Sequence, residues 1–390
     1  MNLFRTLFLL LSAGLFAAYA YGQRNGLYPV TPVCPDSVVD DSFFWSEARD
    51  SAVKADGPGT GYPPLRTLRS ERDLKKALLK WDERRTRLNL LGGCGLPEDS
   101  PAGQGASAIE TAHDSWTLFL ATGKAEYIDV FERAMYNGVR SALEGHESPK
   151  VRREAAKWMK AGPLFAYGVA DSCIYVNFFT VGSVGIATRS IQASITQTGS
   201  YPWASAVQFW VTTTRPNQHF SLRIRIPGWA RNEVLPDDKR FGIEQRRNSF
   251  GLFINEEPVT PTIKDGYIVI ERTWSSCDRI HVHISAPIQR IRTNKTDGQP
   301  ERGRFVYQRG PLVYAFPGSM EGYYIRAKDP VNNTFDNKKR QVFVFTTKRF
   351  KAQGTPADAQ APSFSAQLFP YYRCMSEVPD STTVWINEPH

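Results

Sequence analysis

The chain has 390 residues, a formal net charge of +9 at pH 7, and a composition that is 41% hydrophobic and 22% charged. This composition supplies enough apolar side chains for a packed core and excludes an intrinsically disordered chain. The excess of Lys and Arg is expected to lie on solvated helix faces and loops, with an anionic partner such as an acidic polysaccharide as the alternative. No RNA-recognition, zinc-finger or basic-zipper motif accompanies the charge, so a nucleic-acid partner is not expected.

The N-terminal segment has the pattern of a secretory signal. Arg5 precedes an apolar run from Leu7 to Ala20, which ends in the small-residue pattern Ala18-Tyr19-Ala20. The run is shorter than the roughly 20 apolar residues that a membrane-spanning helix needs. We therefore expect residues 1–20 to be cleaved and the chain to be secreted to the extracellular space, with no membrane partner after cleavage.

The next part of the chain, up to residue 169, is predicted to be helical after an irregular start. Residues 23–62 are rich in Pro, Gly, Asp and Ser, with one short apolar element at Asp41–Trp45. Helical periodicity and end signals then predict four helices, at about Ser70–Asn89, Ala108–Thr122, Lys124–Gly138 and Ser148–Gly162.

From Cys173 onward the hydrophobic period changes to two. Leu222 and Ile224 alternate with Arg223 and Arg225, and later segments alternate in the same way between turn residues. This pattern predicts antiparallel sheets, arranged most plausibly as a sandwich.

One helix start carries a cluster of ionisable residues. In the stretch Ser107–Trp116, Glu110, His113 and Asp114 lie within little more than one helical turn. Ser107 and Glu110 have the spacing of a capping box, in which the serine oxygen caps the helix and the glutamate reaches back to the cap amide. A Glu-x-x-His pair can also bind a metal inside a helical bundle, but two residues do not complete a site. Capping is therefore the expected role of Glu110.

Several ordered motifs resemble glycoside hydrolase family 127, the β-L-arabinofuranosidase group. They are "IETAHDSWTLFLATGKAEYIDVFERAMYNGV", "DSCIYVNFF", "LRIRIPGWA", "GYIVIERTW", "VYQRGPLVYAF" and "FPYYRCMSEVPDSTTVWI", and the resemblance covers about residues 70–390. It implies an (α/α)6 barrel followed by β-sandwich domains. It also implies a retaining enzyme that acts on plant-type glycans. In that family one Glu and three Cys hold a zinc ion, one of these Cys is the nucleophile, and a separate Glu is the general acid/base.

Transferred residue by residue, most of this catalytic pattern is missing. Glu110 matches the zinc-ligand Glu, whereas Ala112 stands at the position of a ligand Cys. His146 and Glu147 stand at the positions of the Cys pair that contains the nucleophile, which makes them the candidate catalytic residues of this chain. The segment that carries the acid/base Glu has no counterpart, and Glu98 is the nearest carboxylate. Zinc is thus the family's cofactor but is not expected here.

The helical part is also short for a complete barrel. Twelve helices need roughly 130–145 residues and their connections roughly 45–70 more, whereas residues 23–169 number 147. The expected fold class is therefore α+β, with a truncated (α/α)6-barrel-like helical region followed by antiparallel β-sandwich domains. The expected domains are a signal peptide (1–20), the helical region (21–169), a middle β-sandwich domain (170–289) and a C-terminal β domain (290–390).

The expected function is that of a secreted, catalytically impaired relative of this family, with an arabinose-containing glycan as its partner. Two alternatives remain open: a non-catalytic carbohydrate-binding or structural β-sandwich protein, and an incomplete gene model of an active enzyme. Trp203 and Trp229 are candidate exposed aromatic residues for glycan binding, although core packing is the commoner role of such residues. His281 and His283 share one strand face, which favours a solvent-facing pair over a metal site.

Overall fold

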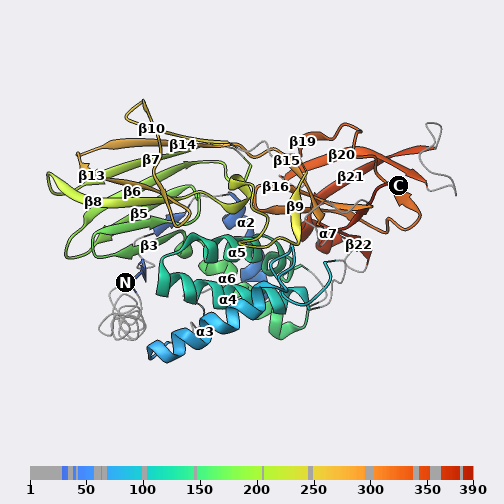
Figure 1. Cartoon of the computed structure of the whole chain (residues 1–390), viewed down its shortest axis with the longest axis horizontal. Helices are drawn as coiled ribbons and strands as arrows, with labels where there is room; N and C mark the ends of the chain where they lie inside the picture. The colour runs from blue at the N-terminus through green and yellow to red at the C-terminus, as the bar shows by residue number, and fades with distance from the viewer. Residues whose placement is uncertain are drawn as a thin grey trace.

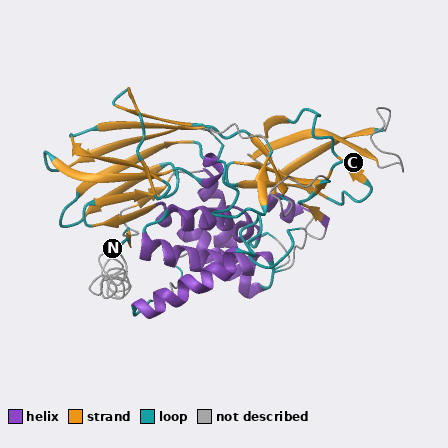
Figure 2. Ribbon diagram, viewed as in Figure 1, coloured by secondary structure: helices purple, strands orange, loops and turns teal. Residues whose placement is uncertain are grey.

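The computed structural model describes a mixed α+β molecule. It describes residues 29–33, 38–40, 43–56, 63, 68–98, 103–144, 147–203, 206–244, 249–294, 303–336, 342–351, 362–377 and 381–389. A layer of helices lies below two β bodies, one on each side of the view (Figures 1 and 2). The predicted signal peptide lies outside these residues, and within them no helix combines the length and apolar character needed to cross a membrane.

The helical layer contains five α-helices among the described residues. They are α2 (Phe43–Asp56), α3 (Glu71–Arg85), α4 (Gln104–Thr122), α5 (Ala125–Ala134) and α6 (Pro149–Ala161), with the π-helical turn η2 (Met135–Val139) after α5 and the 3-10 turn η3 (Gly162–Ala166) after α6. α2 packs on α6, and α4 packs on α5 and η2. Two further elements are the 3-10 turn η4 (Gly228–Arg231) and α7 (Tyr371–Glu377).

Three predicted helix ends are confirmed. Ser70 caps α3 by accepting a hydrogen bond from the Asp73 amide at 3.2 Å, and Ser148 caps α6 by accepting from the Val151 amide at 3.4 Å. Gly123 ends α4 in the left-handed conformation, with φ +69°, which glycine adopts without the steric penalty of a Cβ.

The N-terminal half of the helical region differs from the expectation. The predicted short apolar element is the start of α2, a helix of 14 residues. Phe44, Trp45, Ala48 and Ala52 are all at most 2% exposed and recur at helical spacing. Because two of these four residues are alanines and half of α2 is polar, the stripe gives only a weak hydrophobic signal in the sequence.

The capping-box prediction is wrong. α4 begins four residues earlier than Ala108, with Gly103 as its N-cap at φ +80°. Ser107 therefore lies inside the first turns of the helix. Its hydroxyl accepts a hydrogen bond from the Cys94 amide at 2.7 Å and lies 3.1 Å from the Cys94 carbonyl, so it fastens the preceding loop to the helix.

Two sheets stack as a sandwich on the left of Figure 1. The first has the order β1 (Thr31–Pro32), β3 (Tyr167–Ala170), β4 (Cys173–Val176), β8 (Gln218–Arg225), β13 (Tyr267–Trp274), β12 (Ile263–Lys264). The second has the order β11 (Glu257–Val259), β10 (Phe250–Ile254), β14 (Asp278–Ile284), β7 (Ala206–Thr213), β6 (Gln192–Gly199), β5 (Gly182–Ala187), β2 (Val38–Asp40). The β4–β8 pair is parallel, an exception to the predicted antiparallel pattern.

A third sheet forms the β body on the right of Figure 1. Its order is β18 (Tyr323–Tyr324), β20 (Val342–Lys351), β21 (Ser363–Pro370), β17 (Leu312–Pro317), β16 (Arg304–Arg309), β15 (Ile288–Thr293), β9 (Phe241–Ile243), with β19 (Asn332–Asp336), β22 (Thr382–Thr383) and β23 (Ile386–Asn387) paired to β20, β17 and β16. Since β9 pairs with β15, the middle segment contributes a strand to this sheet. The predicted domain boundaries stay a prediction.

The end of the first sheet that holds Arg225 and Tyr267 is buried on both faces. Leu222 and Ile224 of β8 are 0% exposed, as their alternation predicts. Arg225, which the same alternation places on the polar face, is also 0% exposed. The helical layer covers that face, so the arginine must find charged partners there.

Candidate functional site

Glu110, the predicted metal-ligand position, lies on α4 and faces α3. Its Oε2 is 3.0 Å from Nη2 of Arg84. Nε of the same arginine is 3.3 Å from Oδ2 of Asp114, and its Nη1 donates to the Thr111 hydroxyl at 3.2 Å. The guanidinium is about nine-tenths buried, so it needs these acidic partners. Glu110 therefore helps to neutralise a cation between two helices.

His113 does not join Glu110 in a site. Its ring contacts Trp158 of α6 edge-on, with ring centroids 5.8 Å apart. α4 thus directs Glu110 toward α3 and His113 toward α6. The i,i+3 spacing that suggested a metal pair instead connects α4 to its two neighbouring helices.

Glu147, one of the two candidate catalytic residues, caps α4 from outside the helix. Its Oε1 accepts a hydrogen bond from the Gly105 amide at 2.8 Å. Gly105 is in the first turn, where backbone amides lack helical partners and favour a negative charge. A Cβ at this position would lie 2.5 Å from the Ala142 Cβ and 2.9 Å from the carboxylate, so the close approach depends on glycine. His146 lies outside the described residues.

The loop before α4 is fixed by a buried amide network. Asn89 accepts hydrogen bonds from the amides of Leu91 (3.0 Å) and Gly93 (2.9 Å), and its Nδ2 donates to the Leu96 carbonyl and to Oε1 of Gln104. These bonds use both polar atoms of a side chain that is 4% exposed. Residues 89–96 of this loop are therefore fastened to the first turn of α4 through Gln104.

Glu98, the nearest carboxylate to the missing acid/base segment, is also engaged. Its Oε1 accepts from the Leu90 amide and its Oε2 accepts from Nε1 of Trp385, both at 2.9 Å. With 8% exposure, it ties the helical layer to the C-terminal segment. Both oxygens thus accept hydrogen bonds from the protein, whereas a general acid must give its proton directly to the glycosidic oxygen.

The most buried charges lie between α5 and β8. Nη1 of Arg225 is 2.5 Å from Oδ1 of Asp129, and its Nη2 is 2.6 Å from Oε1 of Glu132. The Tyr201 hydroxyl donates to the same Glu132 oxygen at 2.7 Å. Asp129 also accepts from Nη2 of Arg231 at 2.9 Å. These five residues, hereafter the charge clamp, join the helical layer to the middle sandwich.

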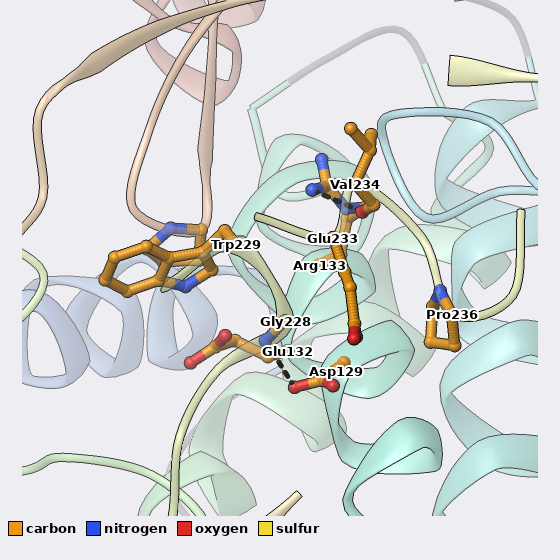
Figure 3. Close-up of a pocket in the computed structure, with 9 residues that line it drawn as sticks. Asp129, Glu132, Arg133, Gly228, Trp229, Glu233, Val234 and Pro236 are labelled. Atoms are coloured by element: carbon orange, nitrogen blue, oxygen red, sulfur yellow. Dashed lines mark hydrogen bonds between the residues drawn. The ribbon is translucent and has the colours of Figure 1, made fainter. Parts of the chain in front are cut away.

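Arg133, which follows Glu132 on α5, extends these contacts to the right-hand sheet. Arg133 donates to the carbonyls of Leu90 (3.1 Å) and Val234 (2.9 Å), and to Oε1 of Gln308 on β16 at 2.7 Å. Figure 3 shows Arg133 beside the segment from Gly228 to Pro236. The segment Asp129–Arg133 of α5 therefore connects the helical layer to the middle sandwich and to the third sheet.

Burial and ion pairing act in opposite directions on the pKa values of this region. Burial raises the pKa of the Glu132 carboxyl, more than the charge of Arg225 lowers it. Burial alone would lower the pKa of Arg225, but the carboxylates of Glu132 and Asp129 raise it above its ordinary value. Burial lowers the pKa of Arg133 to about 10. Such shifts occur at catalytic sites and in structural ion-pair networks alike, so access decides between them.

Access to Asp129 and Glu132 of the charge clamp is narrow, whereas Arg231, its outer member, lines an open depression of about 300 Å³. The pocket drawn in Figure 3 is lined by Asp129, Glu132, Arg133, Gly228, Trp229 and their neighbours and encloses about 10 Å³. That volume is close to the minimum that holds one water molecule. A sugar ring cannot enter this pocket, and the cluster is therefore structural.

The sandwich and the order of elements have known counterparts. The model of the β-L-arabinofuranosidase GH127 middle domain matches residues 173–286. The fold is similar to that of a GH127 β-arabinofuranosidase, with a TM-score of 0.72 and 21% identity over 88% of this chain and 59% of the other. The chain is GH127-like.

Two further relatives agree with this GH127-like identity. A GH127 β-L-arabinofuranosidase from Geobacillus stearothermophilus T6 has a TM-score of 0.66 and 20% identity, over 88% of this chain and 59% of its own. A non-reducing end β-L-arabinofuranosidase from Bifidobacterium longum subsp. longum is 20% identical over 58% of this chain. The GH127-like chain spans 38% of the length of that relative.

The zinc site that the GH127 resemblance implies does not fit the residues present. A guanidinium, not a metal, lies against the Glu110 carboxylate. Ala112, at the position of a ligand Cys, is 0% exposed and has no donor atom. Within the described ranges, no group of three or more His, Cys, Asp and Glu could hold a metal ion.

Sequence reasoning missed the charge clamp. Its acidic members lie in the motif "DVFER" and its arginines in and just after "LRIRIPGWA", and both motifs carry the GH127 resemblance. Two sequence features belong to this cluster: an arginine at the end of an apolar strand, and a helix with two acidic residues on the side that becomes buried. Only the packing of that helix on that strand, 96 residues apart at Asp129 and Arg225, makes the pairing visible.

Proposed function

We propose that this chain is an exported GH127-like protein that has lost the retaining β-L-arabinofuranosidase activity associated with the family while keeping a carbohydrate partner. The loss of activity is supported by what the residues at the family's catalytic positions do here. The carbohydrate partner follows from the class of reaction named for the GH127 relatives. Export follows from the signal pattern over residues 1–20.

One observation carries the proposal: the acidic residues at the matched positions already serve the fold. Glu147 holds the first turn of α4 through the Gly105 amide. Glu110 neutralises Arg84. A retaining mechanism needs a nucleophile in line with the anomeric carbon and an acid at the leaving oxygen. Glu147 is held through its Oε1 at the N-terminus of α4, where its carboxylate serves as a cap.

The proposal includes the absence of a resident zinc ion. A catalytic zinc needs about three protein ligands and an open position. Here the matched positions supply one carboxylate, which is paired with Arg84, and one alanine. The thiol chemistry that zinc supports in the family therefore has no counterpart at these positions.

Hydrolysis of p-nitrophenyl β-L-arabinofuranoside tests the proposal. The full chain, expressed through a secretory pathway, is assayed with and without added zinc beside an intact GH127 enzyme. We expect release of nitrophenol at the buffer rate only, while the intact enzyme turns over. Turnover that Glu147→Gln or His146→Ala abolishes would refute the proposal and would assign the chemistry to these two residues.

Transcript sequencing separates the loss of activity from an incomplete gene model. The family's missing blocks would fall between Gly95 and Gly105 and between Ala142 and Ser148. We expect the transcripts to encode the same residues as the chain at both places. Additional coding sequence at both places would instead indicate an active enzyme with an incomplete gene model.

A further inference from the structure

The outer face of the second sandwich sheet carries an exposed aromatic cluster. On β10, β14 and β7, alternate residues turn inward to the core, and the others face solvent. Phe253 pairs with His281, and His281 pairs with Gln208, so the three side chains form one row across the strands. Trp210 stands in the next row, paired with Arg279.

This face is open in the molecule. Phe253 is 37% exposed, among the few large apolar side chains that are exposed in the described residues. The rings of Phe253 and His281 lie 5.9 Å apart at 31°, and Trp210 is half-buried beside them. Figure 1 shows β7, β10 and β14 at the upper left, on the side away from the helices. Trp229, by contrast, is 5% exposed, and Trp203 packs against Phe335.

The aromatic rings border a depression with a polar rim. It is lined by Gln208, Phe209, Trp210, Phe253, Glu256, Arg279, Ile280 and His281. Its volume of about 380 Å³ lies in the range of roughly 300–1,000 Å³ that small-molecule sites occupy. The depression can therefore hold a ligand of a few rings, unlike the pocket beside the charge clamp.

The rim is neutral and rich in hydrogen-bonding groups. Nη1 of Arg279 lies 3.4 Å from Oε1 of Glu256, so the two exposed charges balance each other. The Gln208 amide offers both donors and an acceptor. Nε2 of His281 is buried without a hydrogen-bond partner among the described residues. The rim therefore offers a ligand the Gln208 amide and a balanced pair of charges.

These features together select the ligand class. A saccharide presents an apolar C–H face, which packs on aromatic rings, and a rim of hydroxyls that donate and accept hydrogen bonds. A balanced rim favours a neutral saccharide over an anionic one, because no unpaired positive charge is available to hold a carboxylate or sulfate. We propose that the β7–β14–β10 face is a non-catalytic binding site for a neutral saccharide chain.

This inference rests on the carbohydrate partner of the proposed function. It adds a site to that partner, remote from the matched catalytic positions. It also predicts that the site recognises the ring faces and hydroxyls of the saccharide rather than its charge. The aromatic Phe253 is the residue on which binding depends most, because its ring is exposed and its removal leaves the core intact.

Affinity electrophoresis of the full chain tests the site. The gels contain linear arabinan or xylan as neutral polysaccharides and polygalacturonate as an acidic one. We expect a neutral gel to retard the chain. The affinity for the polysaccharide should fall at least about tenfold in Phe253→Ala, because the stacking surface is lost. Phe253→Tyr should keep the affinity. Phe364→Ala is the matched control, since Phe364 is 45% exposed on β21 of the third sheet.

Several outcomes would overturn the site. They are no retardation in either neutral gel, a retardation by polygalacturonate that exceeds the neutral gels and that Phe253→Ala abolishes, or retardation in a neutral gel that Phe253→Ala and Arg279→Ala leave unchanged. Light scattering that finds a dimer dispersed by Phe253→Ala would assign the face to self-association instead. Hydrolytic turnover would refute the proposed function but leave this result standing, because retardation is measured independently of turnover.

Discussion

Glu147 offers the sharpest test of a structural role at a catalytic position. Its carboxylate accepts one hydrogen bond, from the Gly105 amide at 2.8 Å, at the N-terminus of α4. Replacing a side chain that caps a helix by alanine costs about 1 kcal/mol. The negative charge beside the helix dipole adds about 0.3–1 kcal/mol. Glu147→Ala should therefore lose about 1–2 kcal/mol of local stability, and Glu147→Gln only the part due to charge.

Hydrogen–deuterium exchange of the peptide that covers the first turns of α4 measures this loss locally. A cost of about 1–2 kcal/mol corresponds to roughly 5–30-fold faster exchange in Glu147→Ala. The glutamine variant keeps an oxygen acceptor for Gly105, so its exchange should rise by roughly two- to fivefold. Glu154→Ala is the control, because its partner is Lys157 on the surface of α6. Equal exchange in the alanine and glutamine variants, or no change in either, would refute the capping role.

Two other predictions concern buried charge. Arg225→Met should destabilise the chain by about 3–5 kcal/mol, because it leaves the carboxylates of Asp129 and Glu132 buried without their cation. Thermal unfolding of Arg225→Met and of the double variant Arg225→Met/Glu132→Gln checks this, and the double variant should recover part of the lost stability. A loss of stability below about 1 kcal/mol in Arg225→Met, or no recovery in the double variant, would contradict the prediction. Burial alone would raise the pKa of Asp278, but hydrogen bonds from Asn255 and Ser275 hold it below the ordinary 3.8. Its stabilising contribution is therefore present above about pH 4 and lost as the pH falls through the lowered pKa. The drop in melting temperature between pH 6 and pH 2 should be smaller in Asp278→Asn, and an equal drop would count against the assignment.

Local signals predicted the elements whose ends depend on local chemistry. Ser70, Gly123 and Ser148 end their helices as expected, because a cap needs only residues within one turn. Period-two alternation likewise predicted β8 and β14. These features can be read from ten to fifteen consecutive residues.

Features that depend on distant partners could not be predicted in this way. The start of α4 is set by Glu147, 42 residues away from the Gly105 amide, and by the loop that Ser107 fastens. The burial of Arg225 depends on a helix that precedes it by almost 100 residues. α2 was missed because two aromatic residues and two alanines form a buried stripe within a polar segment.

The family resemblance identified the matched positions but not their present contacts. Glu110 aligns with a metal ligand, yet the local sequence gives no sign that Arg84 would take the place of a cation beside it. Glu147 stands where a cysteine is expected, and its capping role appears only when α4 and the segment before α6 are packed together. Residue identity therefore indicated which positions to inspect, and the structure shows the present contacts of Glu110 and Glu147.

Zinc content tests most directly the central claim, that the metal and nucleophile positions of the family now serve as structural contacts. The full chain is purified without chelators, dialysed against zinc-buffered solution, and analysed by mass spectrometry for metal, beside Glu110→Ala. We predict far less than one zinc per chain and no difference between the two proteins, because Arg84 already neutralises the carboxylate. About one tightly held zinc per chain, lost in Glu110→Ala, would contradict the account and restore a metal site of the family's kind.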